Sequence, residues 1–340
     1  MHRPTRLFVL LLFACLLNGC VVGPSPAVTI SANAPAPPRR PNLAPPVLPT
    51  PDPYAGLAID DLAARSYGAG ELRIEQVLGV SNRFTRTLIS FDSDNLRVVG
   101  FMNVPTGEGP FPVVIVNHGY IDPAVYTTLT YTTRYADALA AAGYLAIHPN
   151  LRNYPPSDAG PNEFRIGFAV DVLNLIGLIR KGGGQPGALA QADPAAIGLW
   201  GHSMGGGVTL RTITVSPHVR AAILYGAMSG DEARNHERIL FFSNNQRGLW
   251  EADAVPDTAA LQRISPVNYL DRITAAVGIH HGEFDEQVPL AWSEELCTQL
   301  QTLEKTVDCF TYAGMAHTFQ GDGDALFIAR TIDFFDQHLR

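Results

Sequence analysis

The chain has 340 residues, of which 46% are hydrophobic and 16% are charged, and its formal net charge is −8. This apolar content excludes a wholly disordered chain, because disordered chains lack the hydrophobic residues that offset the entropy lost on folding. The acidic balance, with 32 Asp and Glu against 24 Lys and Arg, excludes the basic surface that binds nucleic acid. The length suggests two domains at about 150 residues each, although α/β folds often keep about 250 residues in one core.

The N-terminal segment has the pattern of an export signal. Arg3 and Arg6 precede an unbroken apolar run over residues 7–17. The run is too short for a membrane-spanning helix, which needs about 20 apolar residues, and a basic flank before a short apolar stretch is typical of a secretory signal. The run leads into the sequence LNGC, ending at Cys20, which resembles the lipobox of bacterial lipoproteins. The resemblance implies that residues 1–19 are a signal peptide and that a lipid on Cys20 anchors the exported protein to a membrane of the cell envelope. The alternative is plain secretion with an incidental Cys20.

A proline-rich segment follows the signal. Residues 23–53 contain eleven prolines, which disfavour both helix and sheet and favour an extended, polyproline-like chain. We therefore predict that residues 20–53 form a tether between a lipidated Cys20 and a folded body over residues 54–340. An unordered tail without a spacing role would have the same sequence.

Two cysteines remain once Cys15 and Cys20 are assigned to the export signal, namely Cys297 and Cys309. They lie twelve residues apart, and an exported protein is exposed to an oxidising environment that permits a disulfide. We predict this bridge, the alternative being two free buried thiols.

The body alternates between strand and helix patterns. Strand patterns occupy residues 74–80, 86–90, 96–104, 112–117, 144–148, 196–200, 219–225, 275–280 and 306–312. Helix patterns occupy residues 127–142, 163–180, 205–215, 290–303 and 324–339. The β-branched run PVVIVN at 112–117 is typical of a strand buried on both faces. The alternation predicts an α/β fold, in which a mostly parallel twisted sheet is covered by helices on both faces.

One segment departs from the alternation. Residues 226–272 contain no clear strand pattern, and we predict that they form a small helical insertion. Long insertions of this kind in compact domains are commonly lids or binding loops.

The sequence GHSMG, residues 201–205, carries the first chemical signal. It follows a predicted strand and opens a predicted helix, which is the context of a nucleophile elbow. Glycines two residues on either side of Ser203 allow the close backbone packing of such a turn. Ser203 is therefore the predicted nucleophile, the alternative being a glycine-rich turn with an incidental serine. His202 is expected to point away from the Ser203 hydroxyl and to support the turn.

A serine hydroxyl needs a base to take its proton and a carboxylate to orient that base. In the chain order of this elbow, the acid and then the histidine follow the nucleophile. Asp285 follows a predicted strand and is the expected acid, with Glu283 as the alternative. His317 follows the last predicted strand and is the expected base.

The anionic intermediate of such a reaction needs two convergent N–H donors. One is expected to be the backbone N–H of Met204, which directly follows the nucleophile. The other is expected to be the backbone N–H of Tyr120, because Gly119 lets the loop after strand 112–117 approach the serine. An ordinary turn at residues 118–119 is the alternative.

With these residues identified, the chain resembles the α/β-hydrolase superfamily, and within it the prolyl oligopeptidase catalytic domain and the dienelactone hydrolases. The segments that carry the resemblance are FPVVIVNHGY, GHSMGGG, HHGEFDEQVP and YAGMAHTF, and the similarity covers roughly residues 70–340. The Gly119-Tyr120 and GHSMGGG pair is also similar to bacterial cutinases and polyester hydrolases, in which the matching Tyr and Met backbones form the oxyanion hole.

These features predict an exported serine hydrolase that cleaves carboxylic esters through an acyl-enzyme, without a cofactor or a metal. Its expected substrates are small-molecule or polymeric esters. Two alternatives stay open: a serine peptidase of the prolyl oligopeptidase type that acts on short peptides, and a non-catalytic, surface-binding lipoprotein.

Overall fold

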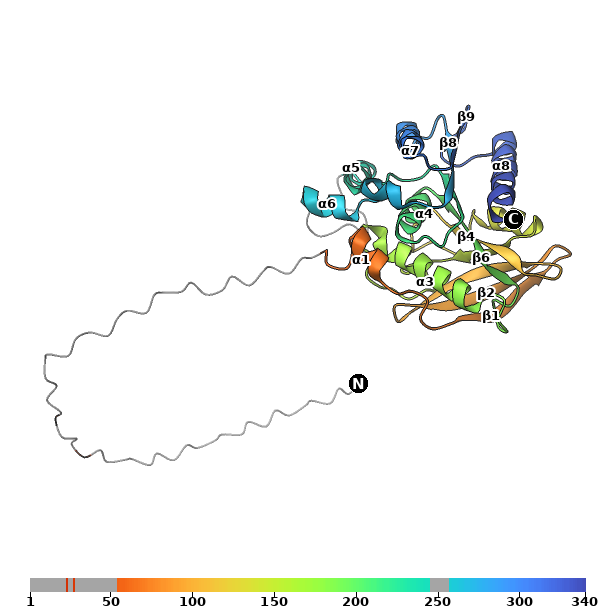
Figure 1. Ribbon diagram of the computed structural model, residues 1–340, viewed down its shortest axis with the longest axis horizontal. Helices are drawn as coiled ribbons and strands as arrows, with labels where there is room; N and C mark the ends of the chain where they lie inside the picture. The colour runs from red at the N-terminus through yellow and green to blue at the C-terminus, as the bar shows by residue number, and fades with distance from the viewer. Residues whose placement is uncertain (1–22, 24–26, 28–53, 245–256) are drawn as a thin grey trace, which may run out of the picture. The chain divides into compact units, whose positions relative to one another are not determined.

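The computed structural model describes residues 54–244 and 257–340, together with Gly23 and Ala27 (Figure 1). The predicted signal peptide over residues 1–19, the lipidation site at Cys20 and, apart from these two residues, the predicted tether over residues 20–53 lie outside the described residues.

A single nine-stranded sheet forms the centre of the body. Its strands are β1 (Leu72–Val80), β2 (Phe84–Ser93), β3 (Leu96–Pro105), β4 (Phe111–Asn117), β5 (Leu145–Pro149), β6 (Ala192–His202), β7 (Ala221–Tyr225), β8 (Ala276–Gly282) and β9 (Val307–Tyr312). The spatial order is β1-β2-β3-β5-β4-β6-β7-β8-β9. The pairs β1–β2, β2–β3 and β3–β5 are antiparallel, and the remaining five are parallel. The prediction of a mostly parallel sheet is confirmed.

Helices cover both faces of this sheet (Figure 1). They are α1 (Ile59–Ala64), α2 (Thr133–Ala141), α3 (Ile166–Gly182), α4 (Met204–Val215), α5 (Glu232–Phe242), α6 (Thr258–Ile264), α7 (Leu290–Thr302) and α8 (Gly321–Leu339). Successive residues of β4 point to opposite faces. Val113 and Ile115 belong to the core that includes α3, α4 and α7, whereas Val114 and Val116 belong to the core that includes α2 and α8.

Three predicted helices differ from the structure by three or more residues at their N-terminal ends. The helix expected over 324–339 begins earlier, at Gly321. The helix expected over 127–142 begins only at Thr133, since the Thr127 hydroxyl bonds the Leu129 carbonyl and such local bonds compete with helix formation. The helix expected over 163–180 is interrupted at Phe164 and Arg165, whose φ angles of 51° and 62° are left-handed. The short helix α1 was not predicted, because one buried turn has too few residues to show a period.

In its described residues, the segment 226–272 contains helices and no strand, as predicted. It contains α5, α6 and the 3₁₀ helix η2 (Pro266–Arg272), while residues 245–256 lie outside the described residues. A buried ion cluster ties it to the body: Glu232 accepts from Arg165 and from Arg211, each at 2.5 Å.

The predicted disulfide between Cys297 and Cys309 is present, with an S–S distance of 2.01 Å. It joins α7 to the edge strand β9, whose C-terminal end leads toward His317.

Four histidines lie buried with lowered pKa values: His118, His148, His202 and His280. Burial is the largest cause in each case, and it lowers the pKa of His202 and of His280 to about 3. An unfolded histidine titrates near pH 6.5, so below that pH the unfolded chain binds protons that the folded chain does not. The free energy of unfolding should therefore fall as the pH falls from about 6.5 toward 3.

Replacing one of these side chains should weaken that dependence. For His280→Gln we expect a smaller slope of the free energy of unfolding against pH between pH 4 and pH 6. The slope should be lower than that of the wild type by roughly 1 kcal/mol per pH unit. Urea unfolding at a series of pH values measures the slope. A variant with the wild-type slope would show that His280 does not enter the native state uncharged.

Candidate active site

Ser203 occupies a sharp turn between β6 and α4. Its φ of 56° and ψ of −118° lie outside the regions that non-glycine residues favour, which marks a strained backbone. Both flanking glycines are required by close packing. A Cβ on Gly201 would lie 2.2 Å from the Gly205 carbonyl oxygen, and a Cβ on Gly205 would lie 2.2 Å from the Asn117 carbonyl oxygen. Ser203 is partly exposed, while its two neighbours in the chain are buried.

Asp285 and His317 are in direct contact, although 32 residues separate them. Asp285 follows β8 and His317 follows β9, and His317 Nδ1 lies 2.7 Å from Asp285 Oδ2. Both side chains are almost completely buried. Glu283, the alternative acid, instead accepts the backbone N–H of Gly314 at 3.0 Å.

The Asp285 carboxylate receives hydrogen bonds on both oxygens. Oδ1 accepts the backbone N–H groups of Gln287 and Val288, each at 2.8 Å. Oδ2 faces His317 and also His281, whose Nε2 lies 3.2 Å away. Burial raises the pKa of Asp285, but the hydrogen bonds from His281 and His317 outweigh it and hold that pKa well below its usual value. The carboxylate therefore stays ionised.

The contact of His281 with the acid was not predicted from the sequence. Its Nδ1 lies 2.7 Å from Ser293 Oγ on α7, and its Nε2 lies 3.0 Å from the Val288 carbonyl oxygen. The available signal was its position four residues before Asp285 at the end of a buried strand.

The serine loop and the acid–base pair meet at Gly226, which follows β7. A Cβ on Gly226 would lie 3.2 Å from Asp285 Oδ2 and 3.4 Å from His317 Nδ1. The backbone N–H of Ser203 donates to the carbonyl of Tyr225, the residue before Gly226, at 2.9 Å. Within residues 54–244 and 257–340, no hydrogen bond joins the Ser203 hydroxyl to His317. Such contacts often shorten only when substrate binds.

The loop after β4 also reaches the serine. A Cβ on Gly119 would lie 3.1 Å from Ser203 Cβ, so any larger residue there would press against the nucleophile. The Gly119 N–H is already used, because it donates to the Tyr131 hydroxyl at 2.9 Å. The next N–H along the loop belongs to Tyr120, whose side chain is 55% exposed. Met204 is the first residue of α4, a position whose N–H has no acceptor within its own helix.

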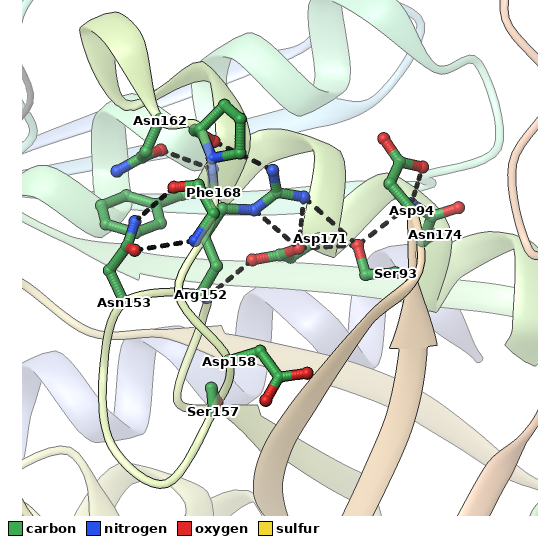
Figure 2. A network of polar contacts seen from close by, with 12 residues as sticks. Ser93, Asp94, Arg152, Asn153, Ser157, Asp158, Asn162, Phe168, Asp171 and Asn174 are labelled. Carbon is green, nitrogen blue, oxygen red and sulfur yellow. Dashed lines mark hydrogen bonds and ion pairs between the residues drawn. The ribbon is translucent and has the colours of Figure 1, made fainter. Parts of the chain in front are cut away.

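A buried polar network holds the neighbouring loop, which follows β5 (Figure 2). His118 Nε2 lies 2.9 Å from the carbonyl oxygen of Asn150, which begins the loop after β5. Arg152 in that loop bonds Asp171 on α3 through its backbone N–H at 2.8 Å and through its guanidinium at 2.8 Å. The Ser93 hydroxyl donates to the same carboxylate at 2.6 Å. The loop is thus fixed to a helix and a strand of the core.

Among the residues that the structure describes, no group of three or more His, Cys, Asp or Glu side chains is arranged to hold a metal ion. Over the same residues, no helix combines the length and the apolar character needed to cross a bilayer.

Residues 187–340, which contain Ser203, Asp285 and His317, match the sequence model of the prolyl oligopeptidase family. A Synechocystis protein that carries a provisional assignment as a carboxymethylenebutenolidase is 22% identical over 251 residues, which are 72% of this chain and 89% of that protein.

Two solved structures have similar folds. An acylaminoacyl peptidase in complex with a chloromethyl ketone has a TM-score of 0.62 at 21% identity, covering 76% of this chain and 42% of that chain. Acetyl xylan esterase 1 from Thermoanaerobacterium has a TM-score of 0.60 at 16% identity, covering 83% of this chain and 92% of that chain. The chain also spans only 42% of the first curated peptidase that it matches. The strand order and these similarities confirm the α/β-hydrolase fold of this chain, which combines a prolyl oligopeptidase-family match over residues 187–340 with a site of the serine-hydrolase type.

Proposed function

We propose that the protein is a serine hydrolase that cleaves carboxylic esters through an acyl-enzyme intermediate. The 2.7 Å contact between Asp285 and His317, on the loops next to the strained Ser203 turn, carries this proposal. Ser203 would attack the ester carbonyl, His317 would take the proton and pass it to the leaving alcohol, and Asp285 would orient the imidazole. A water molecule would then attack the acyl carbonyl while His317 takes its proton. His317 would return that proton to the Ser203 oxygen as the carboxylic acid leaves.

The tetrahedral intermediate would bind its oxyanion to two backbone N–H groups. Met204 supplies one at the start of α4, where the helix dipole also favours negative charge. Tyr120 is the second donor, since the Gly119 N–H is engaged by Tyr131.

Coverage of the relatives supports an ester substrate over a peptide. The chain spans 92% of the acetyl xylan esterase but 42% of the acylaminoacyl peptidase. The family match over residues 187–340 favours the peptidase alternative, which uses the same mechanism. A direct comparison of substrates decides between the two.

The N-terminal sequence supports a location for this activity. A signal over residues 1–19 and a lipid on Cys20 would hold the catalytic body at a membrane of the cell envelope, with the proline-rich segment as spacer.

The acid can be identified by a matched pair of variants. Asp285→Asn should lower kcat for p-nitrophenyl acetate about 10³- to 10⁴-fold, because a neutral amide neither stabilises the imidazolium nor fixes its tautomer. Glu283→Gln should stay within about threefold of wild type. The reverse ranking would assign the acid to Glu283.

The nucleophile can be tested by covalent labelling. A fluorophosphonate probe should label the wild type at Ser203, and Ser203→Ala should lose both the label and ester hydrolysis while retaining its thermal unfolding midpoint. An unlabelled, folded wild type would instead favour the non-catalytic surface-binding alternative.

The substrate class is tested by assaying esters of increasing acyl length, a polyester film and peptide amides under the same conditions. We expect kcat/KM for esters to exceed that for the matched amides by at least 100-fold, since alkoxide is the better leaving group. Comparable values for a short peptide amide would support the peptidase alternative.

The lipid anchor is tested in cells. The wild type should fractionate with membranes, and Cys20→Ser should shift the protein to the soluble or secreted fraction. Equal fractionation of the two would contradict lipidation at Cys20.

A further inference from the structure

The residue before the nucleophile, His202, contacts two loops that are far apart in the sequence. Its Nδ1 lies 2.6 Å from the Tyr131 hydroxyl, and its Nε2 lies 2.9 Å from the backbone carbonyl oxygen of His317. The Tyr131 hydroxyl also accepts the backbone N–H of Gly119 at 2.9 Å. The His202 ring is 3% exposed and packs against the His317 ring at 4.6 Å. These four groups form a continuous chain of hydrogen bonds.

The direction of each bond follows from the chemistry of the partners. A carbonyl oxygen only accepts hydrogen bonds. His202 Nε2 must therefore carry a proton and donate a hydrogen bond to the backbone carbonyl of His317. Burial lowers the pKa of His202 to about 3, which leaves the ring neutral and makes Nδ1 an acceptor for the Tyr131 hydroxyl. The same hydroxyl accepts from Gly119. The series of hydrogen bonds therefore runs from the Gly119 N–H through the Tyr131 hydroxyl and the His202 ring to the His317 carbonyl.

The two ends of this chain lie in the two loops that must meet around Ser203. Gly119 directly precedes Tyr120, the expected oxyanion donor, and His317 is the expected base. We propose that Tyr131 and His202 are positioning residues. They fix the loop that contains Gly119 and Tyr120, the oxyanion loop, relative to the loop that carries His317, the histidine loop. This inference rests on the proposed hydrolase function, although the hydrogen bonds themselves can be tested without a substrate.

The geometry leaves little room for substitutes. A Cβ on Gly119 would lie 2.9 Å from the Tyr131 hydroxyl and 3.3 Å from His202 Nδ1, so a side chain there would displace both partners. Loss of the hydroxyl would leave the Gly119 N–H and His202 Nδ1 without their partners and would free the His202 ring to turn away from His317. Displacement of a catalytic group by about 1 Å can cost 100-fold in rate.

Tyr131→Phe removes the central hydroxyl and keeps the ring. We expect kcat for p-nitrophenyl acetate and the rate of fluorophosphonate labelling to fall 10- to 100-fold, with KM within threefold. The matched control is Tyr312→Phe, which removes a hydroxyl that bonds a different buried histidine, His280, at 2.8 Å. It should keep kcat within threefold. Equal losses in the two variants would reduce the effect to general destabilisation and would overturn the proposal.

His202 itself is tested by two replacements that also serve if Tyr131→Phe fails to fold. His202→Phe keeps an aromatic ring but has no polar atom, and should lower kcat as Tyr131→Phe does. His202→Gln can still donate to the His317 carbonyl and accept from Tyr131, and should recover at least threefold over His202→Phe. The double variant Tyr131→Phe/His202→Phe should lose no more than either single variant, since the residues act as one unit. Multiplied losses, or no recovery by Gln, would contradict the proposed chain.

Nitrogen-15 NMR of the histidines separates this inference from the proposed function. In the wild type, His202 should be neutral with its proton on Nε2, and Tyr131→Phe should shift the Nδ1 resonance. A proton on Nδ1 would overturn the chain of hydrogen bonds even in an active hydrolase. If His202 has the predicted tautomer but the protein hydrolyses no ester or amide, the hydrogen bonds are confirmed and their proposed role in positioning catalytic groups is contradicted.

Discussion

Parallel pairing of β6, β7, β8 and β9 is the constraint on which the site depends. In register, His202 pairs with Tyr225, Tyr225 with His280, and Gly282 with Tyr312. Parallel strands end at one edge of the sheet, so the turns that follow them meet there. Ser203, Gly226, Asp285 and His317 all lie within a few residues of those strand ends. A slip of one residue between strands would turn their side chains to the opposite face and separate the groups.

Electrostatics then determines which form each side chain takes. Asp285 is buried as an anion, which is unfavourable without compensation, and hydrogen bonds from two backbone N–H groups and two histidines supply it. The backbone bonds hold Oδ1, so Oδ2 is the oxygen that faces His317. The His202 ring, whose centroid lies 4.6 Å from that of His317, forms no hydrogen bond to a carboxylate, and burial lowers its pKa and leaves it neutral. Two histidines on neighbouring loops are thus placed in different surroundings, one against a carboxylate and one between a hydroxyl and a carbonyl.

Much of the sheet and the order of Ser203, Asp285 and His317 could be predicted because both depend on local sequence. Continuous β-branched runs identify buried strands, and glycines around a serine identify a turn that needs them. The helix start at Thr133, the break at Phe164 and Arg165, and the second histidine on Asp285 could not be predicted in the same way. The first depends on a side-chain bond from Thr127 to Leu129, and the third on the path of the loop that returns Asp285 to His281. The break at Phe164 and Arg165 accompanies a bond between Arg165 and Glu232, 67 residues apart. Tyr131 was equally hidden, since it lies in a segment whose composition suggested a helix.

The oxyanion loop shows why such distant partners are polar. It is held on one side by the contact of His118 with Asn150 and on the other by the bond from Gly119 to Tyr131. Apolar side chains of similar size would fill the same space with little loss of packing, and buried polar groups are often no more stabilising than well-packed apolar ones. They would, however, leave the backbone N–H of Gly119 and the carbonyl of His317 unsatisfied in a dry interior, which is costly. Both backbone groups lie in loops that cannot be regular, because each must leave the sheet to reach Ser203. The irregular backbone therefore requires polar side chains to complete its hydrogen bonds, and the position of those side chains in turn fixes where the two loops stand.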